Sequence, residues 1–464
     1  MAEKVNGLLG RSLKHSFSED IHRELGNPSY RLYELEPEQL EAFLTGNEIE
    51  LLNVTIPYKK TIAPYCAVLS DEAQAIGSVN TIISTPDGLY GHNTDIFGFN
   101  YMVARAGIAL ADKKVLIFGG GGASASAGYA AQKSGARSVV VISRRGEDNY
   151  GTLPNHADAE VLVNATPLGM YPSEIGNSVV DLALFPQCEA VLDLVYNPLR
   201  TALMMQATAR GIVCTGGLAM LVAQAKAAAE LRLSRQEADG VLGHPGDRAL
   251  GQSADGATAP LGSGTVSPSP GIPVSLFSEP SPSCPLRPSP EIERILRLIQ
   301  AKQENIILIG MPGSGKTTIG KELAQIAGRV LVDLDDKVVD AAGMTIPEIF
   351  SKLGEEAFRD LESEQAALYG REHGLIITAG GGIIKQDRNY APLRQNGRLY
   401  HVVRGTALLT REGRPLSLQA DLEQLSKERL PQYINFRDVA IDNSGTPKET
   451  AECIWKEFNE YTRH

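Results

Sequence analysis

The sequence predicts an α/β fold in two parts, each built around a parallel sheet, with an unfolded linker between them. Residues 113–141 and residues 305–327 both contain a buried strand, a glycine-rich turn and a helix, the repeating unit of parallel α/β sheets. Residues 239–290 are dominated by Gly, Pro, Ser and Ala and show neither helical nor strand periodicity. Such a segment buries too little apolar surface to offset the entropy lost on ordering, so it predicts a domain boundary.

Length and composition indicate a globular protein of several domains. A chain of 464 residues suggests about three domains, and 43% hydrophobic with 21% charged residues is ordinary for soluble proteins. The net charge of −11 disfavours nucleic acid or an anionic membrane as a partner. The sequence contains neither a membrane-spanning apolar run nor the apolar core of a signal peptide, so we expect a cytoplasmic protein. The five cysteines are widely spaced without a CxxC motif, which fits a reducing compartment and gives no zinc site.

The first half opens with a predicted strand at residues 5–10, followed by a loop that carries Ser16 and Ser18. A helix is expected to start near Glu19. Two hydroxyls near a helix N-terminus can hold a carboxylate together with backbone donors. Serine also caps helices, and this stretch alone favours that simpler interpretation.

Further polar residues are expected at strand or loop ends of the first half. Residues 51–56 (LLNVTI) predict a strand that Pro57 stops, which leaves Lys59 just beyond the strand end, where α/β sheets place ligands. The runs GSVNT (77–81) and GHNTD (91–95) add Asn and Thr at similar positions. Such residues usually form turns, but three clusters could also converge on a polyol.

A dinucleotide-binding unit is the clearest feature of this half. Residues 115–118 form the predicted strand, 119–122 the glycine turn and 123–134 the helix, whose N-terminal amides suit a pyrophosphate. The cofactor-binding residues of this turn are Gly119, Gly121, Gly122 and Ala123, with Ser124 at the position where Gly or Ala is usual. After the next strand (139–142) an acidic residue would favour NAD. Arg144 and Arg145 occur there instead, and guanidinium groups suit the 2′-phosphate of NADP.

Residues 1–234 resemble shikimate dehydrogenase. The matching stretches are HSFS (15–18), NVTIPYK (53–59), GSVNT (77–81), HNTD (92–95), GGGGAS (119–124), NATPLGM (164–170), DLVYNPLRT (193–201) and GGLAMLVAQA (216–225). The resemblance implies a substrate-binding lobe over residues 1–97, completed by the helices near residues 217–234. It also implies a Rossmann NADP-binding lobe over residues 98–216.

The resemblance also implies roles for individual residues of this half. Its substrate-binding residues would be Ser16, Ser18, Asn53, Thr55, Lys59, Asn80, Asp95, Tyr196 and Gln224. The two serines, with Thr55 nearby, would hold the substrate carboxylate, and Asn53, Asn80, Asp95 and Gln224 the ring hydroxyls. Tyr196 and Gly217 match positions at the substrate and nicotinamide ends.

In that family, hydride passes from NADPH to the C3 ketone of 3-dehydroshikimate and gives the oxygen alkoxide character. A proton donor must therefore lie beside this oxygen, and Lys59 with Asp95 is the matching catalytic pair. Residues 146–158 are shorter than the family's usual connection, which contains a helix, so the NADP contacts in this part are expected to differ.

The second half starts with a predicted helix at residues 291–302, in which Ile292, Ile295, Leu296 and Ile299 fall on one face. A buried strand (305–309) then leads into GMPGSGKT (310–317), the full GxxxxGK[ST] pattern in its strand–loop–helix context. The predicted ATP-binding residues are Gly313, Ser314, Gly315, Lys316, Thr317 and Thr318. Lys316 would neutralise β- and γ-phosphate oxygens, and the Thr317 hydroxyl would ligate Mg²⁺.

Two acidic residues and a glycine run follow the phosphate loop. Asp333 and Asp335 are expected two residues apart at the end of a strand (VLVDLD, 330–335), so that both side chains project to one side. One carboxylate could then support Mg²⁺ and the other an acceptor hydroxyl. The run 380–382 (GGG) after the predicted strand 375–378 could let a ligand approach the backbone, or could be a tight turn.

Residues 304–457 resemble shikimate kinase. The matching stretches are GMPGSGKTT (310–318), DLDDKV (333–338), GEEAFRDLE (354–362), ITAGGGI (377–383), GRPL (413–416) and KERLPQY (427–433). The resemblance implies a P-loop kinase domain over residues 291–464, with Lys316 and Asp335 catalytic and with Thr317 and Asp333 at the metal.

The same resemblance assigns the kinase's ligand contacts. The implied substrate-binding residues are Asp335, Arg359, Gly381 and Arg429. Arg414 would reach the phosphates from a short lid (404–422), and Arg411 would contact adenine.

Together, the two resemblances predict an enzyme that reduces 3-dehydroshikimate with NADPH and then phosphorylates shikimate with MgATP. One alternative is that one half is a retained binding or regulatory module. Another is a dehydrogenase that prefers quinate with NAD, which Arg144 argues against. A linker of ~50 residues spans on the order of 40 Å, so the sequence predicts two co-localised sites without a fixed orientation or a sealed channel.

Overall fold

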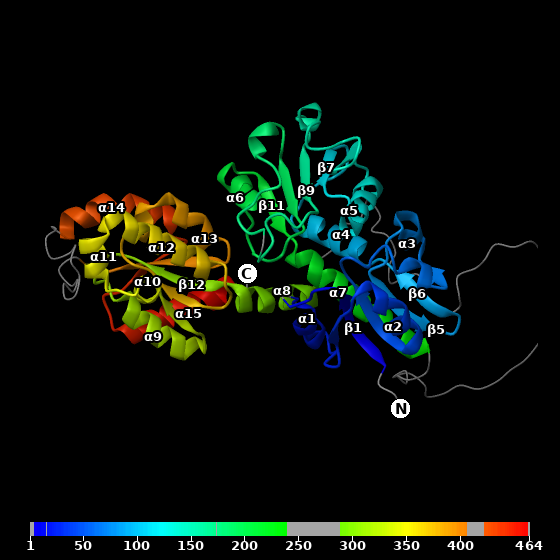
Figure 1. Cartoon of the computed structure of the whole chain (residues 1–464), viewed down its shortest axis with the longest axis horizontal. Helices are drawn as coiled ribbons and strands as arrows, with labels where there is room; N and C mark the ends of the chain where they lie inside the picture. Colours follow the sequence, from blue (N-terminus) through cyan, green and yellow to red (C-terminus); the bar gives the residue numbers. More distant parts are fainter. Residues whose placement is uncertain (1–3, 15, 173, 239–287, 406–421, 463–464) are drawn as a thin grey trace, which may run out of the picture. The chain divides into compact units, whose positions relative to one another are not determined.

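The computed structural model describes residues 4–14, 16–172, 174–238, 288–405 and 422–462. Nearly all of the predicted linker therefore lies outside the described residues, as do Arg411 and Arg414. Among the described residues the strands form three sheets with helices packed on them, which confirms the α/β class (Figure 1). The chain divides into two compact units, Met1–Tyr101 with Val222–Arg287 and Met102–Leu221 with Pro288–His464.

The first sheet belongs to the first unit and has the strand order β2-β1-β3-β5-β6-β4. Its strands are β1 Val5–Gly10, β2 Arg31–Glu34, β3 Ile49–Val54, β4 Val68–Leu69, β5 Thr81–Thr85 and β6 Gly88–His92. The helices of this part are α1 Ser18–Glu24, α2 Leu40–Gly46, α3 Asp71–Ile76, α4 Asp95–Arg105 and α7 Leu218–Ala238. β1 and β3 are parallel, while β5 runs antiparallel to both β3 and β6, with Asn53 opposite Thr81 and Thr81 opposite His92. This pairing brings the three polar clusters predicted from the sequence onto neighbouring strands.

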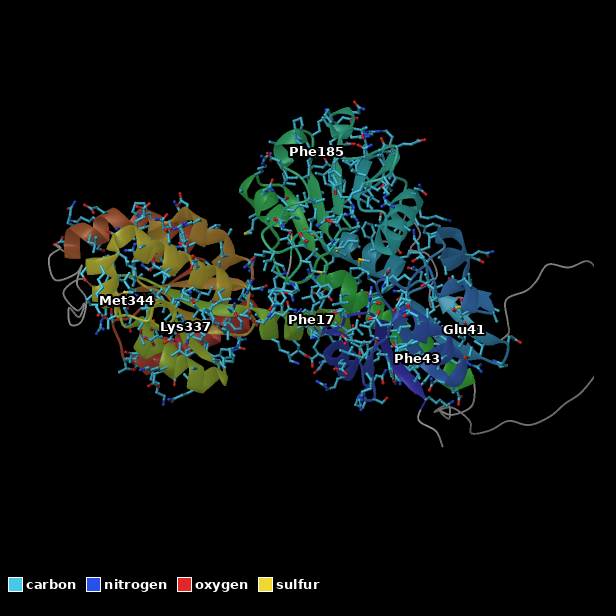
Figure 2. All side chains as sticks on the ribbon, viewed as in Figure 1. Phe17, Glu41, Phe43, Phe185, Lys337 and Met344 are labelled. Carbon is cyan, nitrogen blue, oxygen red and sulfur yellow. The ribbon has the colours of Figure 1, made fainter. Side chains whose placement is uncertain are left out.

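The second sheet is entirely parallel, with the order β11-β10-β9-β7-β8. Its elements are β7 Lys114–Phe118, α5 Gly122–Lys133, β8 Ser138–Ile142, β9 Val161–Asn164, β10 Ala190–Asp193, α6 Ala202–Ala209 and β11 Val213–Gly216. β8, which follows β7 in the chain, lies on one side of β7, and β9 lies on the other side. The glycine turn after β7 is therefore at the switch point where open α/β sheets bind ligands. Phe185, labelled in Figure 2, packs edge-on against Phe118 in the core of this lobe.

The third sheet is also parallel, in the order β13-β14-β12-β15-β16. Its strands are β12 Asn305–Ile309, β13 Leu331–Asp333, β14 Ile376–Thr378, β15 Gly397–Val403 and β16 Val439–Asp442. Its helices are α8 Pro290–Gln303, α9 Lys316–Ala327, α10 Leu334–Ala342, α11 Ile346–Lys352, α12 Gly354–Gly370, α13 Tyr390–Arg394, α14 Leu422–Phe436 and α15 Pro447–Tyr461.

Residues 306–309 of the central strand of the third sheet are all apolar, as expected of a strand with helices on both faces. Ile307 packs with residues of α12 and α14, whereas Ile306 packs with residues of α9 and α15. Figure 1 shows α12 and α14 on one side of this sheet and α9 and α15 on the other. Both faces are therefore buried, and the phosphate loop extends from the carboxyl end of this strand. The predicted lead-in helix is confirmed as α8: Ser289 caps it, and the four residues of its predicted apolar face, Ile292, Ile295, Leu296 and Ile299, are buried.

One element boundary differs from the sequence-based prediction. The strand expected to include Asp335 ends at Asp333, and α10 begins at Leu334. Asp333 caps this helix by accepting a hydrogen bond from the Asp335 backbone N–H at 3.0 Å. Aspartate is a strong N-cap residue, and acidic residues suit the first turn of a helix, so the local helix signal prevails over strand continuation. The prediction that both carboxylates project from one face of a strand is wrong.

Two further findings concern the shortened connection and membranes. Residues 146–158, where the sequence predicted a shortened connection, contain only a short 3-10 helix, Leu153–His156. Within the part of the chain that the structure describes, no helix is long and apolar enough to cross a membrane.

A buried histidine makes the stability of the first unit depend on pH. His22 is fully buried and stacks on Tyr30 with ring centroids 3.8 Å apart. Burial, reinforced by Arg232, lowers the pKa of His22 from 6.5 to about 3. The folded state prefers the neutral His22 ring. The contribution of this ring to the free energy of unfolding is therefore complete above pH 6.5 and is lost as the pH falls towards 3.

We therefore expect the free energy of unfolding of the first unit to be about 2 kcal/mol lower at pH 5 than at pH 7 from His22 alone. The substitution His22→Phe, which retains a ring for stacking, should remove this part of the pH dependence. The measurement is denaturant-dependent hydrogen exchange in β1 and β3 of both proteins at the two pH values. An identical pH dependence in the wild type and the variant would contradict this assignment.

Candidate active sites

An ion pair in the first unit brings together the two residues predicted to be catalytic there. The Lys59 Nζ donates to Asp95 Oδ2 at 2.6 Å, and both side chains are largely buried. Lys59 follows β3, and Asp95 is the first residue of α4. The other Asp95 oxygen accepts a hydrogen bond from the Asn80 amide at 2.9 Å. The carboxylate is therefore held from two directions and fixes the orientation of the lysine ammonium.

Buried polar side chains extend from this ion pair. Asn80 donates to Thr94 Oγ1 at 3.0 Å and lies 3.5 Å from Gln224 Oε1, which α7 supplies from far along the chain. Asn53 donates to Thr81 Oγ1 at 3.0 Å. Such buried networks have low freedom of movement when their groups are satisfied. The structure thus joins Asn53, Asn80, Asp95 and Gln224 in one polar cluster.

Ser16, Ser18 and Thr55 lie at the same edge of the first sheet. β1 and β3 are parallel neighbours, with Leu9 paired to Val54, so the segments that follow them leave the sheet side by side. The Ser16 and Ser18 hydroxyl oxygens are 3.0 Å apart. The helix that starts here has Phe17 as its N-cap, without a side-chain capping bond from that residue. The Ser18 backbone N–H nevertheless donates to the Ser16 hydroxyl at 3.2 Å, so Ser16 also bonds to the start of the helix.

In the second unit, the glycine turn has the backbone that a dinucleotide-binding loop requires. Gly119 has φ +118°, and a Cβ there would lie 2.8 Å from the Ala165 carbonyl oxygen, so glycine is required. Gly121 is the N-cap of α5, and no atom lies within 4 Å of where its Cβ would be. The turn therefore leaves the amino end of α5 open for a phosphate group.

The two arginines predicted to select NADP follow the neighbouring strand. β7 and β8 pair in parallel with Phe118 opposite Ile142, so the glycine turn and the segment carrying Arg144 leave the sheet at one edge. Arg144 and Arg145 are exposed, and neither makes an ion pair with any residue that the structure describes. Two unpaired guanidinium groups beside the turn are well suited to a phosphate.

The loop that carries Tyr196 is anchored below the cofactor edge of this sheet. The buried Asp193 carboxylate accepts hydrogen bonds from Asn164 at 2.9 Å and from the Thr201 hydroxyl at 2.6 Å. Burial raises the pKa of Asp193 to about 6 even with these donors. Gly217 donates to the Val195 carbonyl oxygen, and a Cβ on Gly217 would lie 2.1 Å from Leu194 O. Only glycine allows this close packing.

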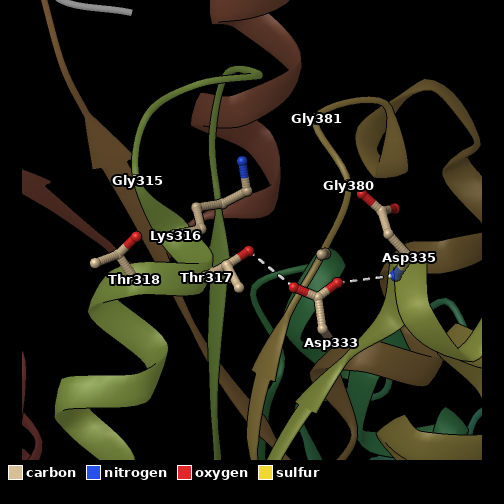
Figure 3. A pocket seen from close by; sticks show the side chains of 9 residues that line it. Gly315, Lys316, Thr317, Thr318, Asp333, Asp335, Gly380 and Gly381 are labelled. Carbon is tan, nitrogen blue, oxygen red and sulfur yellow. Dashed lines mark hydrogen bonds between the residues drawn. The ribbon is translucent and has the colours of Figure 1, made fainter. Parts of the chain in front are cut away.

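A pocket in the third-sheet domain gathers the phosphate loop, the two aspartates and the glycine run (Figure 3). Its lining residues are Gly315, Lys316, Thr317, Thr318, Asp333, Asp335, Ala379, Gly380 and Gly381. The Thr317 hydroxyl donates to Asp333 Oδ2 at 2.8 Å, and Thr378 donates to the same oxygen at 2.9 Å. Lys316 Nζ donates to the carbonyl oxygens of Gly310 and Met311 at 2.8 and 3.0 Å.

The oxygen atoms of Thr317 and Asp333 could supply some of the ligands of a hard cation. A hydroxyl and a carboxylate oxygen in contact are suitable Mg²⁺ ligands, so Thr317 and Asp333 would be able to hold this ion together with a bound nucleotide. In the described part of the chain no group of three or more His, Cys, Asp or Glu side chains could hold a metal by itself.

The glycine run connects the pocket to two buried arginines. Arg359 pairs with Glu362 at 2.7 Å, and a Cβ on Gly382 would lie 2.3 Å from the Arg359 guanidinium. Arg429 donates to the Gly381 carbonyl oxygen at 2.9 Å. A Cβ on Gly381 would also overlap Pro312 of the phosphate loop. The turn is therefore glycine because it lies between the loop and the arginines, at the wall of the pocket.

Comparison with known proteins identifies both halves. The model of the shikimate dehydrogenase substrate binding domain matches residues 8–82, and the shikimate kinase model matches residues 312–459. An NADP⁺-dependent shikimate dehydrogenase of Clostridium perfringens is 33% identical over 254 residues, which cover 49% of this chain and 92% of that protein. The chain belongs to the shikimate dehydrogenase family. Its C-terminal half carries a shikimate kinase domain, so the chain combines an NADP-linked oxidoreductase and a kinase of the shikimate pathway.

Further relatives match the dehydrogenase half over similar lengths. The NADP⁺-dependent shikimate dehydrogenase of Thermosynechococcus vestitus is 32% identical over 272 residues, covering 53% of this chain and 95% of that protein. The crystal structure of shikimate dehydrogenase 1 from Peptoclostridium difficile is 34% identical, with a TM-score of 0.46, over 50% of this chain and 92% of that one.

Some residues that shape the two sites were not singled out from the sequence. In the dehydrogenase half, the Tyr30 hydroxyl donates to Asn53 Oδ1 at 2.8 Å from a loop without any motif. In the kinase half, Glu362 is buried beside Arg359, and burial raises the pKa of this carboxyl group. The spacing of Arg359 and Glu362 along one helix could have indicated their pairing. The Tyr433 hydroxyl, which donates to Gly381 O at 2.8 Å, comes from a helix with no such signal.

Proposed function

We propose that the dehydrogenase half reduces 3-dehydroshikimate to shikimate with NADPH, and that the kinase half phosphorylates the shikimate 3-hydroxyl with MgATP. The observation that carries the first reaction is the Lys59–Asp95 ion pair at the polar cluster of the first unit. The pocket between the phosphate loop and the glycine run supports the second. Assays of the purified full-length chain with each substrate pair test the two reactions separately.

In the reduction, bound NADPH supplies a hydride to the C3 carbonyl carbon of the substrate. Lys59 Nζ then donates a proton to the oxygen as it gains negative charge, and Asp95 keeps the ammonium aimed at it. Asn53, Asn80 and Gln224 can bind ring hydroxyls, because amide groups both donate and accept hydrogen bonds. Ser16, Ser18 and Thr55 hold the substrate carboxylate at the neighbouring strand ends.

In the phosphorylation, bound MgATP supplies the γ-phosphoryl group. Lys316 leaves its loop carbonyls to neutralise the phosphate oxygens, and Thr317 and Asp333 hold the Mg²⁺. Asp335 accepts the hydrogen bond of the attacking hydroxyl. Arg359 and Arg429 bind the shikimate carboxylate beside Gly381, since guanidinium groups match carboxylates in geometry and charge. Arg414, which lies outside the described residues, is proposed to reach the phosphates from the lid.

We expect the double substitution Arg144→Ala with Arg145→Ala to raise the KM for NADPH by roughly 10–100-fold, because each hydrogen bond to a charged group is worth ~1.5–3 kcal/mol. The KM for NADH should change little. Kinetics with both cofactors at fixed 3-dehydroshikimate measure this.

The matched control for these arginines is Arg137→Ala, an exposed arginine of the same lobe that pairs with Glu160. It should leave both KM values unchanged. A wild-type preference for NADH, or equal KM values for NADPH in the double variant and the wild type, would favour the NAD-linked alternative.

A second candidate is that one half only binds its ligands and has lost its chemistry. The shortened connection at residues 146–158, which contains only a single 3-10 turn, is the observation that favours it for the dehydrogenase half. Normal kinase activity without NADPH oxidation on 3-dehydroshikimate would support this candidate. Oxidation of NADPH at ordinary enzymatic rates would exclude it for the dehydrogenase half.

A further inference from the structure

The NADP-binding lobe and the kinase domain contact each other within the second compact unit. Arg200 Nη2 donates to Glu304 Oε1 at 2.6 Å, and the Arg200 backbone N–H donates to the Gln395 carbonyl oxygen at 3.0 Å. The Leu199 N–H donates to Asn396 Oδ1 at 2.9 Å. Residues 197–200 of the lobe thus bind the kinase domain through both backbone and side-chain groups.

A second loop of the lobe reaches the same face of the kinase domain. His373 Nε2 lies 2.8 Å from Asn197 Oδ1. The Tyr171 ring packs edge-on against His373 with centroids 5.5 Å apart, and its hydroxyl donates to Glu372 at 3.4 Å. The contact therefore includes an ion pair, backbone hydrogen bonds and an aromatic pair, from the loops after β9 and β10.

Burial at this contact indicates complementary surfaces. Glu304 and Asn396 have no exposed area, and Asn197 is 3% exposed. A fully buried carboxylate is unfavourable unless a cation and hydrogen bonds compensate it. Among the described residues the cation paired with Glu304 is Arg200, which belongs to the other lobe. The kinase domain thus carries a buried charge that the dehydrogenase half satisfies.

The contact joins the carboxyl edge of the second sheet, in the NADP-binding lobe, to the amino edge of the third sheet, in the kinase domain. On the kinase side it is formed at the amino ends of β12, β14 and β15, one strand length (roughly 16 Å) from the phosphate loop at the carboxyl end of β12. On the dehydrogenase side it is formed at the carboxyl edge, directly after Tyr196. Within the second unit, the contact therefore directly follows the loop that carries Tyr196 and is remote from the phosphate loop of the kinase domain.

We propose that the kinase domain docks on the NADP-binding lobe through Arg200 and its neighbours, and thereby holds the loop that carries Tyr196. The kinase domain is then a positioning partner of the dehydrogenase, while its own nucleotide pocket opens at the other sheet edge. The kinetic consequence rests on the proposed reduction of 3-dehydroshikimate, whereas the docking itself does not.

Hydrogen exchange in the full-length protein tests the docking without any substrate. The variant His373→Ala changes only the kinase side, so the reporter is the dehydrogenase segment 194–201. We expect this segment to exchange about tenfold faster than in the wild type, because its opening would no longer break the contact. In the reverse direction, Arg200→Ala should increase exchange at residues 371–374 and 394–397 but not at 310–317.

The matched control is Arg388→Ala, an exposed kinase arginine that contacts Asp360 and Ser363 within its own domain. It should leave the exchange of residues 194–201 unchanged. With His373→Ala, the KM for 3-dehydroshikimate should rise on the order of tenfold at unchanged kinase kinetics. Exchange of residues 194–201 that is the same in His373→Ala and in Arg388→Ala would overturn the docking. Faster exchange without any NADPH oxidation in the wild type would instead contradict the proposed reaction.

Discussion

Replacing Lys316 with alanine is expected to lower kcat for shikimate phosphorylation by at least ~10²–10³-fold, because the phosphates lose their only fixed lysine in the loop. NADPH-dependent reduction by the same protein should stay within about twofold of the wild type, since Lys316 belongs to the kinase pocket. ADP formation with saturating shikimate, and NADPH oxidation with 3-dehydroshikimate, are measured on one preparation.

The control for this prediction is Lys321→Ala, an exposed lysine on the same helix α9. It removes the same charge from the same helix without touching the pocket, so both activities should persist. An equal kinase loss in the two variants would show that net charge, and not the position of Lys316, determines the rate.

The substitution Lys59→Ala is expected to lower kcat for the reduction by ~10²–10⁴-fold, the usual contribution of a general acid. It also leaves the buried Asp95 carboxylate without its lysine, although the Asn80 amide still donates to it. Kinase activity should remain unchanged. Steady-state kinetics of both reactions, with hydrogen exchange in β3 as a check of folding, give the answer.

Lys60 provides a matched control for Lys59, because it is the next residue and its side chain is exposed. The variant Lys60→Ala should reduce 3-dehydroshikimate at the wild-type rate. A reductase that retains its rate without Lys59 would remove this residue from the mechanism.

Local sequence context predicted the parts of the fold in which one segment determines its own structure. The strand at residues 305–309 and the phosphate loop after it follow from a short apolar run and a glycine pattern. The helix cap at Asp333 shows the limit of such patterns. The local sequence is compatible both with a strand that continues to Asp335 and with a helix that starts at Leu334. The capping preference of Asp333 decides between them.

Contacts between distant segments could not be derived from local patterns. Gln224 reaches Asn80 across 144 residues because α7 returns to the first sheet. The pairing of Arg200 with Glu304 likewise joins two domains and has no motif. Such contacts depend on how whole elements pack, which periodicity and spacing do not encode. The family resemblance predicted a substrate-binding role for Gln224. It assigned no role to Arg200, which only forms part of the matching stretch DLVYNPLRT (193–201).

The proposed docking also changes how the two halves are expected to cooperate. The sequence alone predicted two sites related only by a linker. A contact through Arg200 would fix the NADP-binding lobe against the kinase domain while the nucleotide pocket opens at the opposite sheet edge. The fusion would then act on the dehydrogenase loop as well as on co-localisation.

The central claim is that one chain carries out both reactions in sequence. The most direct measurement incubates the purified full-length protein with 3-dehydroshikimate, NADPH and MgATP, and follows NADPH oxidation and ADP formation together. We predict that the two amounts become equal at completion and that omitting NADPH abolishes ADP formation. Oxidation of NADPH without ADP formation, or the absence of both, would contradict the claim.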